Sequence, residues 1–360
     1  MMKQDYEQFE LIIVDDCSQD QTPLIIKELT EKYPGRIIWI RHETNTGVAQ
    51  ARNTAIQHSQ YDILMMADSD DIQHSTRMRI MYEKLLSTSA DIIFNDCEMI
   101  DDQGYSLGRY KGYPSDLNTD TVLAKLLERN YFWMSLAMLR KTSSIYFDKN
   151  IPTSEDYELF LRMALEQKRF VICQDVLTYY RIHGNNLSSN GNLSLQVTRD
   201  IFKNLDVQHV YKQLSDRYDS STTMRVMASV YAWREEPEQV VRILQHQPYH
   251  MESFFTLAMA YAQTGNYNDS LATFEHIRKQ QQMPNAAVLN NIGVISHQLG
   301  YPSDQAMQWI QQALQVREDY MDALNNLRIL QGEANGTLQL TVRPLRTEIV
   351  HTVASDSQHK

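Results

Sequence analysis

The 360-residue chain contains 34 basic and 45 acidic residues, which gives a formal net charge of −11 at pH 7. This excess of acid excludes the basic stripe that nucleic-acid phosphates require, so we expect no nucleic-acid partner. Hydrophobic residues make up 42% of the chain, which is enough for two domains of ordinary size, each with its own core.

The cysteines and the hydropathy pattern indicate the compartment. Cys17, Cys97 and Cys173 form no CxxC pair, and an odd number of cysteines is typical of a reducing environment. There is no run of 18 apolar residues and no signal-peptide pattern, so the sequence predicts no transmembrane segment. We therefore expect a cytoplasmic protein that is at most peripheral to the inner face of the membrane.

The first part of the chain alternates short apolar runs with longer amphipathic ones. The apolar runs predict strands over 10–14, 36–40, 62–66 and 91–94. The amphipathic runs predict helices that begin at Thr22 and that cover 47–57 and 76–86. Strands that are apolar along their whole length, alternating with helices, are typical of a mostly parallel sheet covered on both faces. The sequence thus predicts an α/β domain.

Acidic residues follow two of these strands directly. Asp15 and Asp16 end the first, and Asp68, Asp70 and Asp71 end the third. Ligands of such sheets bind beyond the carboxyl ends of the strands, so we expect both clusters to face one crevice. Grouped carboxylates are unfavourable unless a cation or a hydrogen-bonding ligand joins them.

From about residue 220 the pattern is helical throughout, and two segments overlay with an offset of 35 to 36 residues. They are 254–277 and 289–314, with Ala258 on Gly293 and Gly265 on Gly300. This pattern resembles the tetratricopeptide repeat, in which small residues let paired helices pack closely and a glycine turns the chain between them. A more degenerate copy covers 224–244, and 323–330 resembles the start of a further one. Three units are about the minimum for a stable stack.

These patterns predict four segments. We expect an α/β domain over 1–195, a linker helix over 196–219, helical repeats over 220–332 and a disordered tail over 333–360, where the sequence is polar and weakly patterned.

Five segments of the first domain resemble, in the same order, the family 2 glycosyltransferases. They are "FELIIVDDCSQDQT" (9–22), "NTGVAQARNTAI" (45–56), "ILMMADSDD" (63–71), "SEDYELFLRMA" (154–164) and "YYRIHGNNLS" (179–188). The resemblance implies the GT-A fold and a metal-dependent transfer, with inversion, of a sugar from a nucleotide-diphosphate donor such as a UDP-sugar. The acceptor would be a hydroxyl group of a glycan, in polysaccharide synthesis, or of a glycoprotein.

The resemblance assigns the "ADSDD" stretch to the cofactor. Asp70 would bind Mn²⁺ or Mg²⁺ directly, Asp68 would face the ribose or the metal, and Asp71 would be a further contact or a helix cap. Such cations are usually held by one or two carboxylates together with substrate oxygens. His183 would be a third ligand or a phosphate donor, assisted by Arg181. The alternative is that the whole cluster is a solvated capping turn.

The same resemblance places the nucleotide beside Asp15 and Asp16. One of them, more readily Asp16, would accept the N3–H of a uracil-type base, and an Asx turn is the alternative. Arg52, with Asn53 beside it, would reach the diphosphate or the base. Arg52 would alternatively pair with one of the two aspartates, and both roles can coexist.

A carboxylate must also remove the proton of the acceptor hydroxyl. By resemblance Asp156 is this base, and Glu155 orients it or contacts the acceptor. Both begin a predicted helix, where the helix dipole stabilises the anion, so we expect the pKa of Asp156 to be low. The alternative reading is a pair of ordinary first-turn acids that cap the helix.

One element of the family is missing from this chain. Only "MMKQDYEQ" precedes the first predicted strand, whereas family members begin with a further strand, so the sheet is expected to lack a central member and an upstream segment is the favoured explanation. This departure supports an alternative function. A catalytically inactive transferase-like domain would then serve with the helical repeats as a scaffold for a protein partner, whereas in an active enzyme the repeats would recruit the acceptor or a partner.

Overall fold

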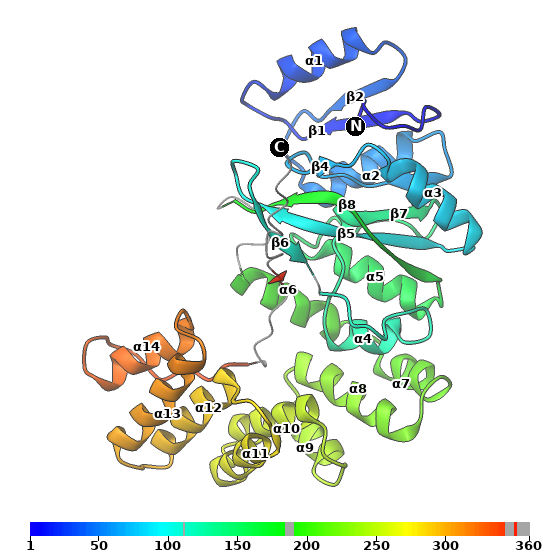
Figure 1. The fold of residues 1–360 in the computed structure, drawn as a ribbon. Coiled ribbons are helices and arrows are strands. Elements are labelled where there is room, and N and C mark those ends of the chain that lie inside the picture. Colours follow the sequence, from blue (N-terminus) through cyan, green and yellow to red (C-terminus); the bar gives the residue numbers. More distant parts are fainter. Residues whose placement is uncertain (111, 184–190, 343–348, 351–360) are drawn as a thin grey trace, which may run out of the picture. The chain divides into compact units, whose positions relative to one another are not determined.

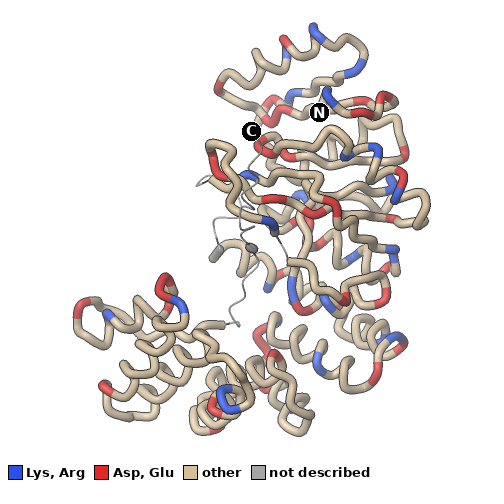
Figure 2. The backbone as a smooth tube through the Cα atoms, viewed as in Figure 1, with Lys and Arg blue, Asp and Glu red and all other residues tan. Residues whose placement is uncertain are grey.

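The computed structural model describes residues 1–110, 112–183, 191–342 and 349–350. The chain divides into two compact units, which are Met1–Ile201 with Glu348–Lys360, and Phe202–Thr347. Acidic and basic residues are interspersed along both units (Figure 2).

The first unit alternates strands and helices (Figure 1). Its strands are β1 (Leu11–Asp15), β2 (Ile37–Arg41), β3 (Ile63–Met65), β4 (Ile72–Gln73), β5 (Ile92–Ile100), β6 (Ser106–Tyr110), β7 (Ala137–Arg140), β8 (Phe170–Arg181) and β9 (Ile349–Val350). Its helices are α1 (Thr22–Lys32), α2 (Val48–His58), α3 (Arg77–Ser87), α4 (Val122–Glu128), the short 3₁₀ helix η1 (Met134–Leu136), α5 (Glu155–Leu165) and α6 (Gly191–Lys203), which reaches the unit boundary. The four strands and three helices predicted from the sequence are confirmed.

The pairing of the strands is mixed, so the parallel part of the sheet is smaller than the sequence predicts. β1 and β2 pair in parallel, as do β5 and β8, whereas β3–β7, β5–β7, β5–β6, β4–β8 and β6–β9 are antiparallel. A tight turn explains one of the antiparallel pairs. The Asp101 carboxylate accepts the N–H groups of Gln103 and Tyr105, and this turn returns the chain directly from β5 into β6.

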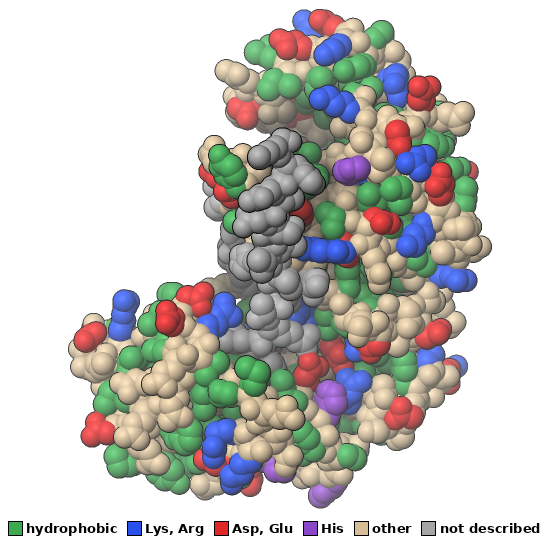
Figure 3. Space-filling model, viewed as in Figure 1, with side chains coloured by type: hydrophobic (Ala, Val, Ile, Leu, Met, Phe, Trp, Pro, Cys, Tyr) green, Lys and Arg blue, Asp and Glu red, His purple; other side chains and the backbone are tan. Residues whose placement is uncertain are grey.

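The strands form two separate sheets. One is β1–β2 alone, and the other follows the order β3-β7-β5-β6-β9, with β8 beside β5 and β4 beside β8. Within the described residues, β1 and β3 therefore each have one edge that pairs with no other strand. Helix α1 also exposes apolar side chains, since Leu24 and Ile25 are 64% and 53% exposed (Figure 3).

Both faces of the larger sheet are covered, as its apolar strands require. Successive residues of a strand point to opposite faces, and in β5 Ile93 and Phe94 do so. Ile93 packs with Met81 and Leu85 of α3. On the other face, Phe94 contacts Phe160 of α5, at 5.2 Å between ring centroids. Figure 1 shows α3 and α5 on either side of this layer. The core thus fixes the position of α5, whose first residues belong to the candidate site.

The second unit consists of helices in consecutive hairpins. They are α7 (Val207–Ser215), α8 (Ser220–Trp233), α9 (Pro237–Leu244), α10 (Met251–Gln263), α11 (Tyr267–Gln280), α12 (Ala286–Gln298), α13 (Ser303–Val316) and α14 (Met321–Leu330). Among the described residues, every helix of the chain is too short or too polar to cross a bilayer.

Glycines act in these hairpins as the overlay of the two segments predicts. Gly265 and Gly300 have φ angles of 78° and 81°, a left-handed conformation that favours glycine and turns the chain between paired helices. Gly293 allows α12 and α13 to approach closely. A Cβ atom placed there would lie 2.9 Å from the carbonyl oxygen of Ala306.

The segment after Gly332 differs from the expectation of disorder as far as residue 342. Gln339 and Thr341 are held by side chains of α12 and α14, and Thr341 is buried. Buried amide side chains need hydrogen-bonding partners, and this segment supplies them. The residues 343–348 and 351–360 lie outside the described part of the chain.

Candidate active site

Three carboxylates converge in the loop between β3 and β4. One oxygen each of Asp68, Asp70 and Asp71 lies within 4.8 Å of the others. All three residues are partly exposed, so a ligand can reach them from solvent. Carboxylate oxygens are the ligands that Mg²⁺ and Mn²⁺ prefer, so this donor set suits such a cation.

His183 lies next to this cluster, as predicted. Its Nε2 atom is 3.0 Å from Oδ2 of Asp70. The imidazole ring is partly exposed, so it borders the same solvent-accessible space as the carboxylates. The remainder of the predicted closing element, residues 184–188, lies outside the described residues.

Arg181, at the end of β8, supports the carboxylate loop through the backbone. Its N–H donates to Oδ1 of Asp71 at 3.0 Å, and its Nε donates to the carbonyl oxygen of Asp70 at 2.9 Å. Its guanidinium also donates to the carbonyl oxygens of Asp101 and Asp102, at 2.8 and 3.0 Å. Arg181 therefore ties the loop to the turn after β5, whereas the sequence assigns it to a phosphate.

A fully buried cation beneath the same loop was not recognised in the sequence. Arg77 donates to the carbonyl oxygens of Met66 and Ser135, at 3.2 and 2.7 Å, and to Oδ1 of Asn95, at 2.9 Å. Burial lowers the pKa of Arg77 to about 10, although the nearby Asp71 opposes this shift. The sequence did not indicate that Arg77 is buried, because an arginine on a helix is usually exposed and its burial is recognisable only from its hydrogen-bonding partners.

The three aspartates differ in their surroundings. Burial raises the pKa of Asp71 to about 6, and the charges of Asp68 and Asp70 add to this effect, while the N–H of Arg181 opposes it. Asp71 lies deepest, and its Oδ2 atom is buried without a hydrogen-bond partner. A cation at the cluster would offset both the burial and the repulsion between the carboxylates.

Asp156 lies at the start of α5, and its Oδ2 atom accepts the backbone N–H of Met134 at 3.3 Å. Burial and, to a lesser extent, the Glu155 charge raise the pKa of Asp156 to about 7, against the opposing effect of Arg52. The expectation of a low pKa from the helix dipole is therefore wrong. Desolvation and the neighbouring carboxylate outweigh the dipole, which acts weakly at the end of a helix.

Arg52 of α2 joins the two acidic regions. Its guanidinium binds Oε1 of Glu155 and lies 3.3 Å from Oδ1 of Asp68. Burial works against the charged form, but the carboxylates of Asp68, Glu155 and Asp156 raise the pKa of Arg52. Arg52 and Glu155, which are 103 positions apart in the sequence, thus meet in this ion pair. The sequence offered Asp15 or Asp16 as a protein partner for Arg52, but in the structure Arg52 binds Glu155 and Asp68 instead.

Asn53, the neighbour of Arg52, contacts the protein backbone. Its Nδ2 donates to the carbonyl oxygen of Phe147 at 2.7 Å, and its Oδ1 accepts the N–H of the same residue at 2.8 Å. This two-point contact holds α2 against the segment that leads to α5. Asn53 therefore positions Arg52, whereas the sequence assigns it to the nucleotide.

Asp16 and its partners form a second cluster around the N-terminus of α2. Its carboxylate accepts the N–H groups of Thr46 and Gly47, the hydroxyl of Thr46, and contacts Nδ1 of His42 at 2.7 Å. Burial raises the pKa of Asp16, but these hydrogen bonds outweigh burial and hold it below its ordinary value. The anion at this helix N-terminus is the protein's own carboxylate.

Asp15 is buried beside Asp16, and it accepts the N–H of Ser18 at 2.8 Å while its other oxygen lies 3.3 Å from Nε of Arg41. The sequence reasoning missed His42, although it follows β2 just as the aspartates follow β1. The rule that polar residues at the carboxyl ends of parallel strands share one edge would have found it.

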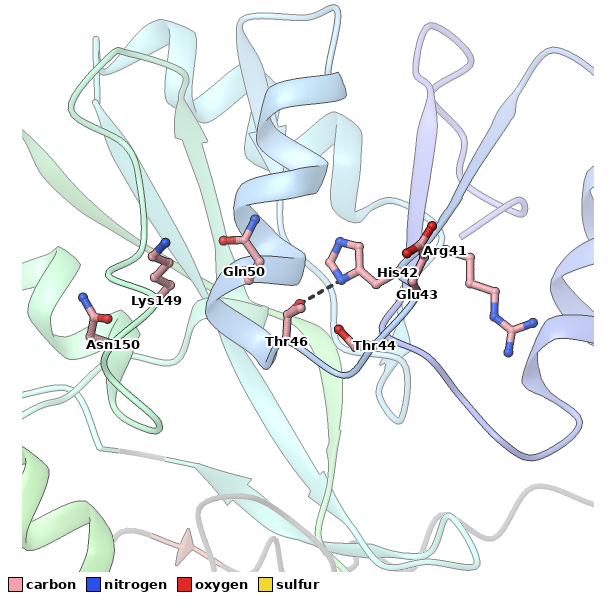
Figure 4. A pocket seen from close by; sticks show the side chains of 8 residues that line it. All are labelled: Arg41, His42, Glu43, Thr44, Thr46, Gln50, Lys149 and Asn150. Atoms are coloured by element: carbon pink, nitrogen blue, oxygen red, sulfur yellow. Dashed lines mark hydrogen bonds between the residues drawn. The ribbon is translucent and has the colours of Figure 1, made fainter.

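A cavity of about 640 Å³ opens beside this second cluster (Figure 4). It is lined by Arg41, His42, Glu43, Thr44, Thr46, Gln50, Lys149 and Asn150. In Figure 4, Lys149 and Gln50 flank one side and Arg41 the other, with His42 and Thr46 between them. Its lining includes two cationic side chains, Arg41 and Lys149, one carboxylate, Glu43, and several neutral hydrogen-bonding groups, so it suits a polar ligand. Helix α2 connects it to Arg52 and hence to the carboxylate cluster.

Comparisons with known proteins identify the family that the first unit resembles. The model of glycosyl transferase family 2 matches residues 1–147. The UDP-Glc:alpha-D-GlcNAc-diphosphoundecaprenol beta-1,3-glucosyltransferase WfgD of Escherichia coli is 26% identical over 191 residues, which cover 53% of this chain and 72% of that protein. The poly(ribitol-phosphate) beta-N-acetylglucosaminyltransferase TarP of Staphylococcus aureus (strain N315) is 25% identical over 228 residues, which cover 58% of this chain and 66% of that protein.

The fold is also found among solved structures. S. aureus TarS 1-349 in complex with UDP-GlcNAc matches with a TM-score of 0.54 and 16% identity, covering 79% of this chain and 87% of that one. This likeness shows a shared GT-A-like fold. The family model and the relatives agree with each other, and residues 1–147 of the first unit form a glycosyl transferase family 2 domain.

Proposed function

We propose that this glycosyltransferase moves a sugar from a UDP-sugar to a hydroxyl group of a glycan or protein acceptor, with inversion at the anomeric carbon and with the help of a divalent cation. The observation that carries the proposal is the Arg52 bridge, because it brings the "ADSDD" carboxylates and the first turn of α5 to one place. A donor-binding group and a candidate base must be neighbours for a single displacement.

The donor would bind along α2. The cavity beside Asp16 and His42 would take the nucleotide, with Arg41 and Lys149 facing its negative charge. The relatives support UDP as the nucleotide, since WfgD is named for a UDP-Glc donor and TarS binds UDP-GlcNAc. Asp16 already accepts several hydrogen bonds, so we infer that it shapes this cavity in addition to any contact with the base.

The cation would be held by Asp70 and Asp68, with His183 beside Asp70. When bound, Mn²⁺ or Mg²⁺ neutralises negative charge that develops on the diphosphate leaving group. Arg181 and Arg77 keep the loop in place from below, so the carboxylates need not be organised when the donor arrives.

Asp156 would take the proton of the acceptor hydroxyl. With a pKa of about 7, its carboxyl is ionised in a large fraction of molecules at neutral pH and is still a stronger base than an ordinary aspartate. Glu155 is bound to Arg52 and would keep Asp156 from forming that ion pair itself. The N–H of Met134 orients the Asp156 carboxylate.

The test is a panel of nucleotide sugars, assayed for release of the nucleotide with Mn²⁺, Mg²⁺ or EDTA. We expect one UDP-sugar to be turned over, loss of activity with EDTA and its recovery on addition of metal. Asp70→Asn should lower metal-dependent turnover at least about tenfold, as loss of groups at metal sites does. Asp102→Asn, in the turn after β5, is the matched control and should change little.

Two results would contradict parts of the proposal. Turnover that is insensitive to EDTA would remove the cation, and a product whose anomeric proton shows retained configuration by NMR would remove the inverting step. The scaffold alternative makes a different prediction. A folded sample that gives no heat of binding with UDP and Mn²⁺ in a calorimetric titration would favour an inactive transferase-like domain.

A further inference from the structure

Helices α12 and α14 share a row of fully buried asparagines. Asn290 and Asn291 lie on α12, and Asn326 lies on α14. All three side chains are inaccessible to solvent. Buried amides are costly unless both their oxygen and their nitrogen are hydrogen-bonded, so these residues must have partners that satisfy them.

Their main partner is the backbone of the chain's own later segment. Nδ2 of Asn326 donates to the carbonyl oxygen of Gln339 at 2.8 Å, and its Oδ1 accepts the N–H of Gln339 at 2.7 Å. Asn291 makes the same pair with Thr341, at 2.9 and 2.8 Å. Alternate residues present their N–H and C=O groups to the same side only in an extended chain. Asn326 and Asn291 thus bind the backbone of an extended segment at two alternate residues, Gln339 and Thr341.

Two side chains of the segment are also recognised. The Thr341 hydroxyl donates to Oδ2 of Asp322 at 2.8 Å and lies 3.3 Å from Nδ2 of Asn290. Between the two backbone contacts, Leu340 packs against an apolar cluster that contains Phe255 and Ile292. In contrast, Gln339 projects its side chain to solvent. The face of α12 and α14 that holds this segment, called the groove below, therefore requires an aliphatic residue followed by a residue with a hydroxyl group. It does not select the side chain at the position of Gln339.

The connection to α14 allows this segment to leave the groove. Residues 331–337 are exposed, and the connection contains Gly332 and Gly336, whose φ angles are 75° and 146°. Exposed connections that contain glycine are flexible, so this one places little restraint on the segment that follows it. The segment is held mostly through backbone groups, which every peptide possesses, so a foreign extended peptide can make the same hydrogen bonds.

We propose that the face formed by α12 and α14 is a binding site for an extended segment of a partner protein, and that residues 339–341 occupy it in cis as a competing ligand. The partner segment would carry an aliphatic residue followed by threonine or serine. Valine in place of the hydroxyl residue would remove the 2.8 Å hydrogen bond to Asp322, whose Oδ2 atom would keep, among the described residues, only the hydroxyl of Tyr320 at 3.3 Å. The proposal does not depend on the sugar-transfer reaction.

The test uses the full chain and a fluorescent peptide with the sequence of residues 335–342, NGTLQLTV. In the double variant Q339P/T341P, proline removes both N–H groups that Asn326 and Asn291 accept, while the groove itself is unchanged. We expect this released variant to bind the peptide, measured by fluorescence anisotropy, at least about tenfold more tightly than the wild type does, because the tethered segment has a millimolar effective concentration.

Two controls sharpen this experiment. Thr337→Pro places proline outside the hydrogen-bonded pairs and should behave like the wild type. Adding Asn326→Ala to the released variant should abolish binding. A peptide with valine at the Thr341 position should bind roughly tenfold more weakly, because it loses the hydrogen bond to the Asp322 carboxylate. Equal binding of both peptides would contradict the proposed reading of the hydroxyl.

The proposal would be overturned if the released variant keeps the helical circular dichroism of the wild type but does not bind the peptide. It would also be overturned if the wild type binds the peptide as tightly as the released variant does. If the released variant does not fold, the unmodified chain supplies the answer. Excess peptide should speed hydrogen exchange at the amides of Gln339 and Thr341, and unchanged protection would contradict displacement. A wild-type dimer that Asn326→Ala dissociates would show that the segment binds in trans, against occupation in cis.

Discussion

The two units each concentrate polar side chains at one place, but the two clusters differ in kind. The crevice of the first unit gathers carboxylates and the arginines that bind them, and the pKa values of two of the carboxylates, Asp71 and Asp156, are raised. The groove of the second unit gathers neutral amides that are fully buried and hydrogen-bonded. Both clusters are built from residues distant in the sequence.

The difference teaches what each cluster is suited to do. Carboxylates that repel one another retain a strong affinity for cations, and burial moves their pKa values toward neutrality, so they suit proton transfer and metal binding. Neutral amides with matched donors and acceptors suit the recognition of a peptide backbone, because nothing in the match depends on charge. The following variants test this division, from the largest expected effect to the smallest.

Asp156→Asn should have the largest effect. The amide keeps the shape of the side chain but cannot accept the acceptor proton, so kcat should fall by about 10²- to 10⁴-fold, the usual contribution of a general base. The affinity for UDP, measured by calorimetry, should remain unchanged. Glu158→Gln is the control, because Glu158 lies on the same helix and binds Arg162 instead of the crevice. Turnover near the wild-type value in Asp156→Asn would refute the assignment of the base.

Arg52→Met should destabilise the first unit by roughly 3 kcal/mol, because it leaves the buried Glu155 and the partly exposed Asp68 without their shared cation. Denaturant unfolding measures the loss. Arg79→Met removes an exposed pair with Asp5 and should cost at most about 1 kcal/mol. Equal losses in the two variants would mean that the Arg52 bridge has no special weight.

The pH dependence of turnover should follow Asp156. Below a pKa of about 7 the carboxyl is protonated, so kcat/KM should rise about tenfold per pH unit toward pH 7 and then level off. Arg52 lowers this pKa, so the rising limb should move to higher pH in Arg52→Met. A limb that stays in place would show that another group titrates.

The raised pKa of Asp156 also makes the free energy of unfolding depend on pH. The folded protein binds this proton more tightly than the unfolded chain, so the contribution is fully present below the unfolded pKa of about 3.9 and is lost as the pH rises through about 7. Asp156→Asn should therefore gain stability relative to the wild type between pH 5 and pH 8, as measured by unfolding at both values.

Asn291→Ala should have the smallest effect. It removes the two hydrogen bonds to Thr341 and should lower the stability of the second unit by about 1 to 2 kcal/mol, with turnover unchanged. Thermal unfolding followed by circular dichroism measures the loss. Asn266→Ala, at an exposed turn, is the control. A loss of turnover in Asn291→Ala would break the division between a reactive crevice and a binding groove.

Much of the fold was readable from local patterns. Apolar runs placed the early strands, and acidic residues directly after two of them placed the carboxylates at the strand ends. The glycines of the helical overlay turn the chain as predicted. The antiparallel pairs of β7 with β3 and β5 were not readable, because they join strands that are distant in the sequence and whose partners are chosen by the packing of the whole sheet.

The sequence predicted which residues lie at the candidate site better than it predicted which groups those residues bind. Asp68, Asp70 and His183 lie together, as predicted. Arg181 and Asn53, in contrast, bind backbone groups of the protein, and Arg77 supports the loop unnoticed. A motif identifies which residue types occur at a strand end, but it does not say which atoms face them from elsewhere in the chain.

The sequence by itself determined the early strands and helices up to residue 94, the helical character of the second unit and the acidic residues that follow two of the strands, because these follow from short-range periodicity and from local turn chemistry. Only the tertiary structure decided the pKa of Asp156, the bridge at Arg52 and the segment that lies against Asn291 and Asn326. Desolvation and hydrogen-bond satisfaction depend on groups that are distant in the sequence, and folding alone brings those groups together.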